Sequence, residues 1–210
     1  MIFTNKLELR TDRLLAMIEP HIAGWPHDEL DVTVRPSRGA EFSGTCRYVP
    51  PRIYVNIGAG NRYPYLITTH IAPARSDRRC WWRELYTVEL ADAYELTLFI
   101  FLHEFYHWLI RKARRNGRQK EGRCDRFATR ALVDVYGAVV RDSAGRPVPR
   151  AAWDFQDLDG FVAAARQAAR QRISPRPVEK AARQPSAQPP KPLPDAVQPP
   201  LDGQLLLFSI

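Results

Sequence analysis

The feature that most constrains this chain is the segment from Leu96 to Asp125, which reads as two helices carrying metal-compatible side chains. His103 and His107 are four residues apart, so on an α-helix both imidazoles project from one face, one turn apart. Asp92 is a suitable N-cap, and we expect this helix to run to about Ala113. With Glu104 beside the histidines, the segment predicts a metal site inside the fold.

A second helix is predicted from about Lys120 to Tyr136, with Gly137 as its stop. Catalytic zinc commonly takes three protein ligands and keeps a fourth position for water. Glu121 can supply the third ligand. Asp125, four residues later on the same face, can accept the free ring N–H of a ligand histidine and so fix its orientation.

His103-Glu104-x-x-His107 followed by Glu121-x-x-x-Asp125-x-Phe127-Ala128 resembles the gluzincin metallopeptidases, in particular the small bacterial and phage ImmA/IrrE-type proteins. The resemblance spans about Leu96 to Leu132, and Cys124 stands where that family usually has alanine. It implies an α+β, zincin-like domain in which a small antiparallel or mixed sheet packs on the active-site helix and a second ligand helix. It also implies one zinc ion held by His103, His107 and Glu121, with Glu104 as the catalytic base of a peptidase.

Other interpretations of this segment stay open. SprT-like and Spartan-type proteases share the first motif, but their third ligand is normally a histidine, and none follows His107 here. The two histidines are alternatively partly buried helix residues without a metal. Arg130 and Tyr136 are both candidates for the donor that stabilises an oxyanion. The three cysteines are widely spaced with no CxxC pair, which argues against a disulfide framework and a cysteine zinc site, and favours small buried hydrophobes in a reducing cytosol.

Short strands and two further helices are predicted around these two. The expected helices are Asn5–Gly24 and Asp157–Arg172, and the expected strands lie around Val32 and Val34, at Cys46–Val49, at Arg52–Ile57 and at Glu84–Leu90. Residues 58–79 read as a loop. In a zincin-like fold an edge strand binds the substrate backbone, and either Arg52–Ile57 or Glu84–Leu90 is expected to be that edge.

The link between the two metal-site helices is strongly basic. Eight Lys or Arg lie between Arg111 and Arg126, in a chain of net charge +8. One interpretation is a solvated helix end, where cations are favoured by the dipole. The other is a footprint for the nucleic-acid backbone beside the site. In that second case the expected contacts are Arg111, Lys112, Arg114, Arg115, Arg118 and Lys120.

The composition changes after the last helix, because nine of the eighteen prolines lie between Ser174 and Gly203. We therefore expect a domain over residues 1–172, a disordered Pro-rich linker over 173–203 and a terminal peptide over 204–210. That peptide, beginning Gln204-Leu205-Leu206-Leu207-Phe208, resembles the bacterial sliding-clamp binding motif. The resemblance implies that Gln204 binds at a pocket rim while Leu205, Leu207 and Phe208 fill it. Alternatively, the tail adds a strand to its own domain.

Together these features predict a zinc endopeptidase that acts on DNA-associated proteins and is tethered to the replication clamp. The first twenty residues do not form a signal peptide and no apolar run reaches membrane-spanning length, so a cytoplasmic protein without membrane partners is expected. Two other functions remain open: a protease that cleaves one specific repressor, and a non-catalytic DNA or clamp adaptor with a structural metal.

Overall fold

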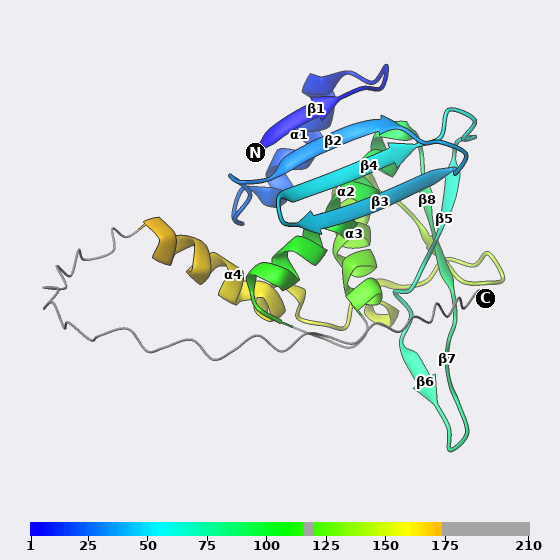
Figure 1. Cartoon of the computed structure of the whole chain (residues 1–210). Helices are drawn as coiled ribbons and strands as arrows, with labels where there is room; N and C mark the ends of the chain where they lie inside the picture. Colours follow the sequence, from blue (N-terminus) through cyan, green and yellow to red (C-terminus); the bar gives the residue numbers. More distant parts are fainter. Residues whose placement is uncertain (116–119, 174–210) are drawn as a thin grey trace, which may run out of the picture. The chain divides into compact units, whose positions relative to one another are not determined.

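The computed structural model describes residues 1–115 and 120–173, which belong to one compact unit, Met1–Pro175. Their fold is α+β with mixed sheets, as predicted (Figure 1). In chain order the elements are β1 (Ile2–Asn5), α1 (Thr11–Ile22), β2 (Asp31–Pro36), β3 (Phe42–Tyr48), β4 (Pro51–Ile57), β5 (Tyr65–Thr69), β6 (Ala74–Ser76), β7 (Trp81–Arg83), β8 (Tyr86–Leu90), α2 (Ala93–Lys112), α3 (Lys120–Tyr136), β9 (Val140–Arg141), a 3₁₀ turn (Arg150–Ala152) and α4 (Leu158–Ile173). The predicted linker (173–203) and terminal peptide (204–210) lie outside the described residues, except for Ile173.

The largest sheet has the order β1-β2-β4-β3, in which β1, β2 and β4 are parallel and β3 is antiparallel to β4. Alternate residues of β2 and β4, such as Val32 and Val55, are fully buried, and α1 and α2 lie on the same side of the sheet (Figure 1). Because β4 lies between two strands, the prediction that Arg52–Ile57 is an edge is wrong. The edge strand that packs on α2 is β3.

A second sheet has the order β5-β8-β9, and β6 pairs with β7 in a separate hairpin. The strand predicted at Glu84–Leu90 is β8, which has a partner on each side and is therefore not an edge either. The segment predicted as a loop, residues 58–79, contains β5 and β6. The first helix begins at Thr11 rather than at Asn5 as predicted, and Ile2–Asn5 form β1 beside β2. These short strands depend on distant partners that local sequence patterns do not reveal.

The two metal-site helices have the predicted bounds. Asp92 caps α2, since its carboxylate accepts hydrogen bonds from the backbone N–H of Tyr94 (2.8 Å) and Glu95 (2.9 Å). Gly137 follows α3 with φ +71°, a conformation that glycine adopts at little cost. α2 is buried on nearly all sides and packs against β3, β4, α3 and α4. Among the described residues, no helix is long and apolar enough to cross a membrane.

Arg126 of α3 is fully buried and joins three parts of the chain. Its guanidinium donates to the carbonyl of Ile71 (2.8 and 3.0 Å), to the carbonyl of Trp153 (2.9 Å) and to the Gln156 side chain (2.7 Å). Burial lowers the pKa of Arg126 to about 10, so the group stays charged near neutral pH. The loop after β5 and the segment before α4 are thereby fixed to the helix that carries Glu121.

Replacing Arg126 by methionine is expected to lower the free energy of unfolding by about 3 kcal/mol or more, since each buried acceptor that loses its donor costs about 1–3 kcal/mol. Urea denaturation measures this loss. Arg146→Met is the matched control. Its side chain is 78% exposed and pairs with Asp142 at the surface, so the expected loss is below about 1 kcal/mol. Equal stability of the two variants would contradict the structural role of Arg126.

Candidate metal centre

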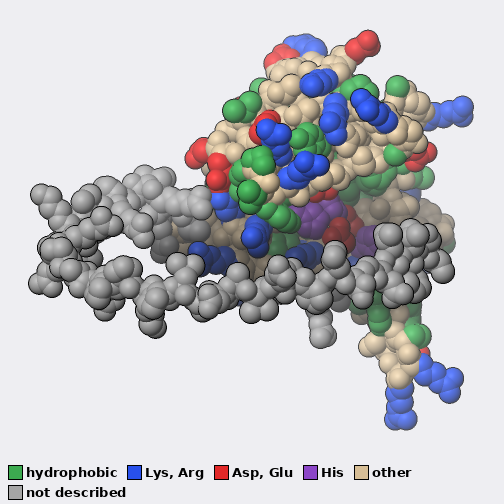
Figure 2. Space-filling view, viewed as in Figure 1, with side chains coloured by type: hydrophobic (Ala, Val, Ile, Leu, Met, Phe, Trp, Pro, Cys, Tyr) green, Lys and Arg blue, Asp and Glu red, His purple; other side chains and the backbone are tan. Residues whose placement is uncertain are grey.

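The side chains of His103, His107 and Glu121 converge where α2 faces the start of α3. His103 Nε2 lies 3.2 Å from His107 Nε2 and 3.2 Å from Glu121 Oε2, and His107 Nε2 lies 3.5 Å from the same oxygen. The histidine side chains are only 17% and 14% exposed, whereas Glu121 is 60% exposed. Figure 2 shows histidine and acidic side chains together in a hollow at the surface. The helices therefore shield the two histidines from solvent, and the site is exposed on the side of Glu121.

These three atoms have the spacing that one zinc ion requires. With metal–ligand distances of about 2.0–2.2 Å in a tetrahedral arrangement, ligand atoms lie about 3.3–3.6 Å apart. The observed distances, 3.2, 3.2 and 3.5 Å, lie within about 0.1 Å of this range. Hydrogen bonds from His103 and His107 hold the pKa of Glu121 well below its usual value, so the carboxylate is anionic and suited to a cation.

Cys124 is a further candidate ligand that the sequence analysis did not predict. Its sulfur and a ring nitrogen of each of His103 and His107 all lie within 4.8 Å of one another. The cysteine is fully buried, as expected from sequence, but it borders the metal cluster rather than only filling the core. Burial raises the pKa of the thiol, which disfavours the thiolate that binds metal. Glu121, whose Oε2 lies 3.2 and 3.5 Å from the two imidazole nitrogens, and Cys124 are both candidate ligands beside the histidines.

Glu104, the expected catalytic base, is buried between α2 and β3. A Cβ atom added at Gly44 would lie 2.7 Å from Glu104 Cγ, so only glycine allows the strand to pass this close to the carboxylate. Burial raises the pKa of Glu104. A carboxylate with a raised pKa takes up and releases a proton more readily near neutral pH, which is what a general acid–base group requires.

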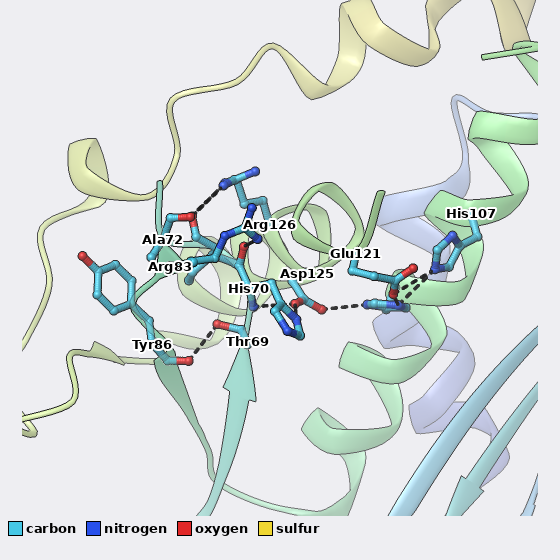
Figure 3. A network of polar contacts seen from close by, with 11 residues as sticks. Thr69, His70, Ala72, Arg83, Tyr86, His107, Glu121, Asp125 and Arg126 are labelled. Atoms are coloured by element: carbon cyan, nitrogen blue, oxygen red, sulfur yellow. Dashed lines mark hydrogen bonds and ion pairs between the residues drawn. The ribbon is translucent and has the colours of Figure 1, made fainter. Parts of the chain in front are cut away.

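Asp125 lies between two histidines, His103 and His70. Its Oδ1 accepts a hydrogen bond from His103 Nδ1–H (2.8 Å), the contact predicted from the sequence. Its Oδ2 accepts from the backbone N–H of His70 (2.7 Å) and contacts His70 Nδ1 (3.3 Å), as Figure 3 shows. Burial alone would raise the pKa of Asp125, but the hydrogen bonds from both histidines outweigh it and lower the pKa. The ionised carboxylate leaves His103 Nε2 directed at the cluster.

Asp125→Asn is expected to weaken zinc binding by about 10- to 100-fold, because the amide holds the His103 ring less firmly in the required tautomer. Competition with a chromogenic chelator measures the affinity. Asp134→Asn is the control, since Asp134 is on the same helix and pairs at the surface with Arg150. If both variants bound zinc as tightly as the wild type, Asp125 would have no part in the metal centre.

The basic residues expected to contact nucleic acid do not share one environment. Arg126, at the end of the run, is buried. Of the six predicted contacts, Arg111 is exposed with its guanidinium 5.6 Å from the Tyr48 ring, Lys112 pairs with Glu29, Arg114 and Arg115 are exposed, Lys120 is half-buried, and Arg118 lies outside the described residues. The run is not one uniform exposed face, and its contact with nucleic acid stays a prediction.

Neither proposed oxyanion donor lies near the cluster. Arg130 and Tyr136 are nine and fifteen residues beyond Glu121 on α3, which places them about 13 and 22 Å along the helix. Arg130 is also paired with Asp154 (3.0 Å). This interpretation is therefore wrong. His70 reads from the sequence as an ordinary loop histidine, with a fourth metal contact as the alternative. In the structure it contacts Asp125, 55 positions away along the chain.

Comparison of the chain with protein-family models, with curated proteins and with solved structures finds no match. The interpretation of the cluster therefore depends on its own geometry.

Proposed function

We propose that this chain is a zinc-dependent endopeptidase with a zincin-like fold. The observation that carries the proposal is the convergence of His103 Nε2, His107 Nε2 and Glu121 Oε2 within 3.2–3.5 Å. The buried carboxylate of Glu104 adds the base that hydrolysis needs. A zinc ion bound by these ligands supplies Lewis-acid activation of water and of the substrate carbonyl.

Glu104 accepts the proton of the attacking water and then delivers it to the amine that leaves when the peptide bond breaks. Water thus adds to the carbonyl carbon, and the products are a carboxylic acid and an amine. Asp125 keeps the His103 ring oriented throughout, because it accepts the Nδ1–H on the side away from the cluster.

The edge strand β3 is suited to hold an extended substrate. Among residues 1–115 and 120–173 it pairs with β4 alone, so the backbone groups on its other side are suited to strand addition. Gly44 lies directly against Glu104, so a peptide bound along β3 passes close to the catalytic carboxylate. The proposed substrate-binding edge is therefore β3 rather than β4 or β8.

Removal of the metal tests the proposed activity. Dialysis against a strong chelator is expected to abolish cleavage of a fluorescent casein, and one equivalent of zinc is expected to restore it, because His103, His107 and Glu121 form a single site. Cleavage that persists in metal-free protein, measured with zinc content below a few per cent, would overturn the proposal.

A second function is supported by the position of Cys124. Four protein ligands around one ion leave no position for water, which is the arrangement of structural zinc sites. If Cys124 joins the two histidines and Glu121, the chain is a non-catalytic adaptor with a structural metal. The distinction rests on which side chains hold the ion.

We further propose that the peptidase acts on DNA-associated proteins and is tethered to a bacterial sliding clamp. Support comes from the sequence alone: the net charge of +8 and the segment Gln204–Phe208, with Gln204, Leu205, Leu207 and Phe208 as the binding residues. Clamp pull-down tests the tether, and undiminished capture of Phe208→Ala would remove it from the proposal. Cleavage of a single repressor without stimulation by DNA would instead mark a dedicated regulator.

A further inference from the structure

The hairpin of β6 and β7 projects from the rest of the described residues (Figure 1). Every residue from Pro73 to Trp82 is exposed. The turn is closed by Asp77, whose carboxylate accepts hydrogen bonds from the backbone N–H of Arg79 and Cys80 (both 2.8 Å). A two-stranded hairpin without a packed face contributes little to the stability of a fold. Stability therefore does not account for this hairpin.

Two of the five tryptophans lie on this hairpin. Trp81 is 72% exposed and Trp82 46% exposed, whereas Trp25, Trp108 and Trp153 are 8% exposed or less. Trp81 and Trp82 therefore do not pack in the core. Adjacent residues of a strand point to opposite faces, so each face of the hairpin presents one indole ring.

Arginines surround the two rings. Arg75 lies directly opposite Trp82 in the strand register, and Arg78 and Arg79 lie in the turn. Among the described residues, these three guanidinium groups have no ion-pair partner, and the Asp77 carboxylate is engaged with the turn backbone. Figure 2 shows the basic side chains at the end of the projection. The hairpin therefore offers exposed aromatic faces beside a net positive charge of three arginines against Asp77.

We infer that the β6–β7 hairpin binds single-stranded nucleic acid, with bases stacked on Trp81 and Trp82 and phosphates contacted by Arg75, Arg78 and Arg79. Aromatic platforms beside arginines suit single strands, because only unpaired bases expose their faces. A membrane-inserting hairpin would carry apolar side chains at its tip, whereas Ser76–Arg79 are polar or charged. The inference goes beyond the proposed peptidase, since binding needs neither the metal nor Glu104.

The base of the hairpin is connected to the metal centre. Arg83, the last residue of β7, donates from Nη1 to the carbonyl of His70 (2.5 Å), and the backbone N–H of His70 donates to Asp125. Asp125 in turn accepts the hydrogen bond from His103 Nδ1–H. Gly122 permits this approach, since a Cβ there would lie 2.6 Å from the His70 oxygen. A nucleic acid bound at the hairpin is therefore held by an element whose base contacts the candidate metal centre through His70 and Asp125.

Fluorescence anisotropy of the full chain with labelled dT20, rU20 and a 20-base-pair duplex tests the inference, with anionic vesicles as a further arm. Trp81→Ala/Trp82→Ala is expected to weaken single-strand binding by at least about 30-fold, since each stacked base contributes a factor of about 5 or more. The control Leu66→Ala/Val135→Ala removes side chains that are 54% and 58% exposed elsewhere and should leave affinity unchanged. The dT20 and rU20 arms distinguish DNA from RNA as the source of the strand.

Intrinsic fluorescence provides a second readout. Binding of dT20 or rU20 is expected to quench tryptophan emission in the wild type but not in the double variant, since the remaining three tryptophans are buried. Circular dichroism and zinc content, unchanged in the double variant, would show that its fold and metal site are intact. The inference would be overturned if the wild type did not bind dT20 or rU20, or if the wild type and the double variant bound them with equal affinity. It would also be overturned if the double variant lost only the binding of vesicles.

Discussion

Replacing Glu104 by glutamine is expected to lower kcat for peptide cleavage by about 10²- to 10⁴-fold while leaving bound zinc unchanged. Glutamine has nearly the same shape, so it fits beneath Gly44 and leaves the three ligands in place. It cannot accept the proton of the attacking water, and the loss should therefore fall on kcat rather than on KM. Steady-state cleavage of a quenched fluorescent peptide, with metal content measured on the same samples, gives both quantities.

Glu95→Gln is the matched control, because it makes the same substitution on the same helix. Glu95 accepts the backbone N–H of Ala91 near the start of α2, away from the cluster. We expect its kcat to stay within about twofold of the wild type, as for other surface substitutions. If Glu104→Gln kept full peptide cleavage with full metal content, Glu104 would not be the catalytic base.

Replacing His107 by alanine is expected to have the largest effect on metal binding. We expect the affinity for zinc to fall by more than about 100-fold, because the loss of a ligand exceeds the loss expected when only the orienting carboxylate of Asp125 is changed. His107 contributes to both candidate ligand sets, with Glu121 and with Cys124. Zinc should raise the melting temperature of the wild type, because a ligand that binds only the folded state stabilises it. It should not raise that of His107→Ala.

His27→Ala serves as the control for this measurement. His27 contacts the carbonyl of Trp25 (2.8 Å) and lies in a different part of the fold. Its variant should respond to zinc like the wild type. A full zinc-dependent shift in His107→Ala would mean that the ion binds elsewhere.

The parts of the fold that the sequence predicts correctly depend on local signals. The bounds of α2 and α3 follow from the Asp92 cap and from Gly137, and the close approach of His103 to His107 follows from their helical spacing. The alternation of Val32 and Val34 likewise predicts β2. Each of these signals lies within a few residues of the structure that it specifies.

The parts that the sequence did not predict depend on contacts between distant segments. β1 is stabilised by pairing with β2, and His70 meets Asp125 across 55 positions. Gly44 matters only because β3 passes directly over Glu104. Arg126 reads as one more cation of a basic run, yet its acceptors come from two distant loops. Residue patterns within one segment contain no information about such partners.

The most direct test of the central claim is the zinc content, by plasma mass spectrometry, of Glu121→Ala and Cys124→Ala after dialysis against a weak chelator. We expect one zinc per chain in the wild type and in Cys124→Ala, and almost none in Glu121→Ala, because Glu121 Oε2 lies 3.2 and 3.5 Å from the two imidazole nitrogens. Zinc retained by Glu121→Ala and lost from Cys124→Ala would contradict this expectation and assign the third ligand to the thiolate.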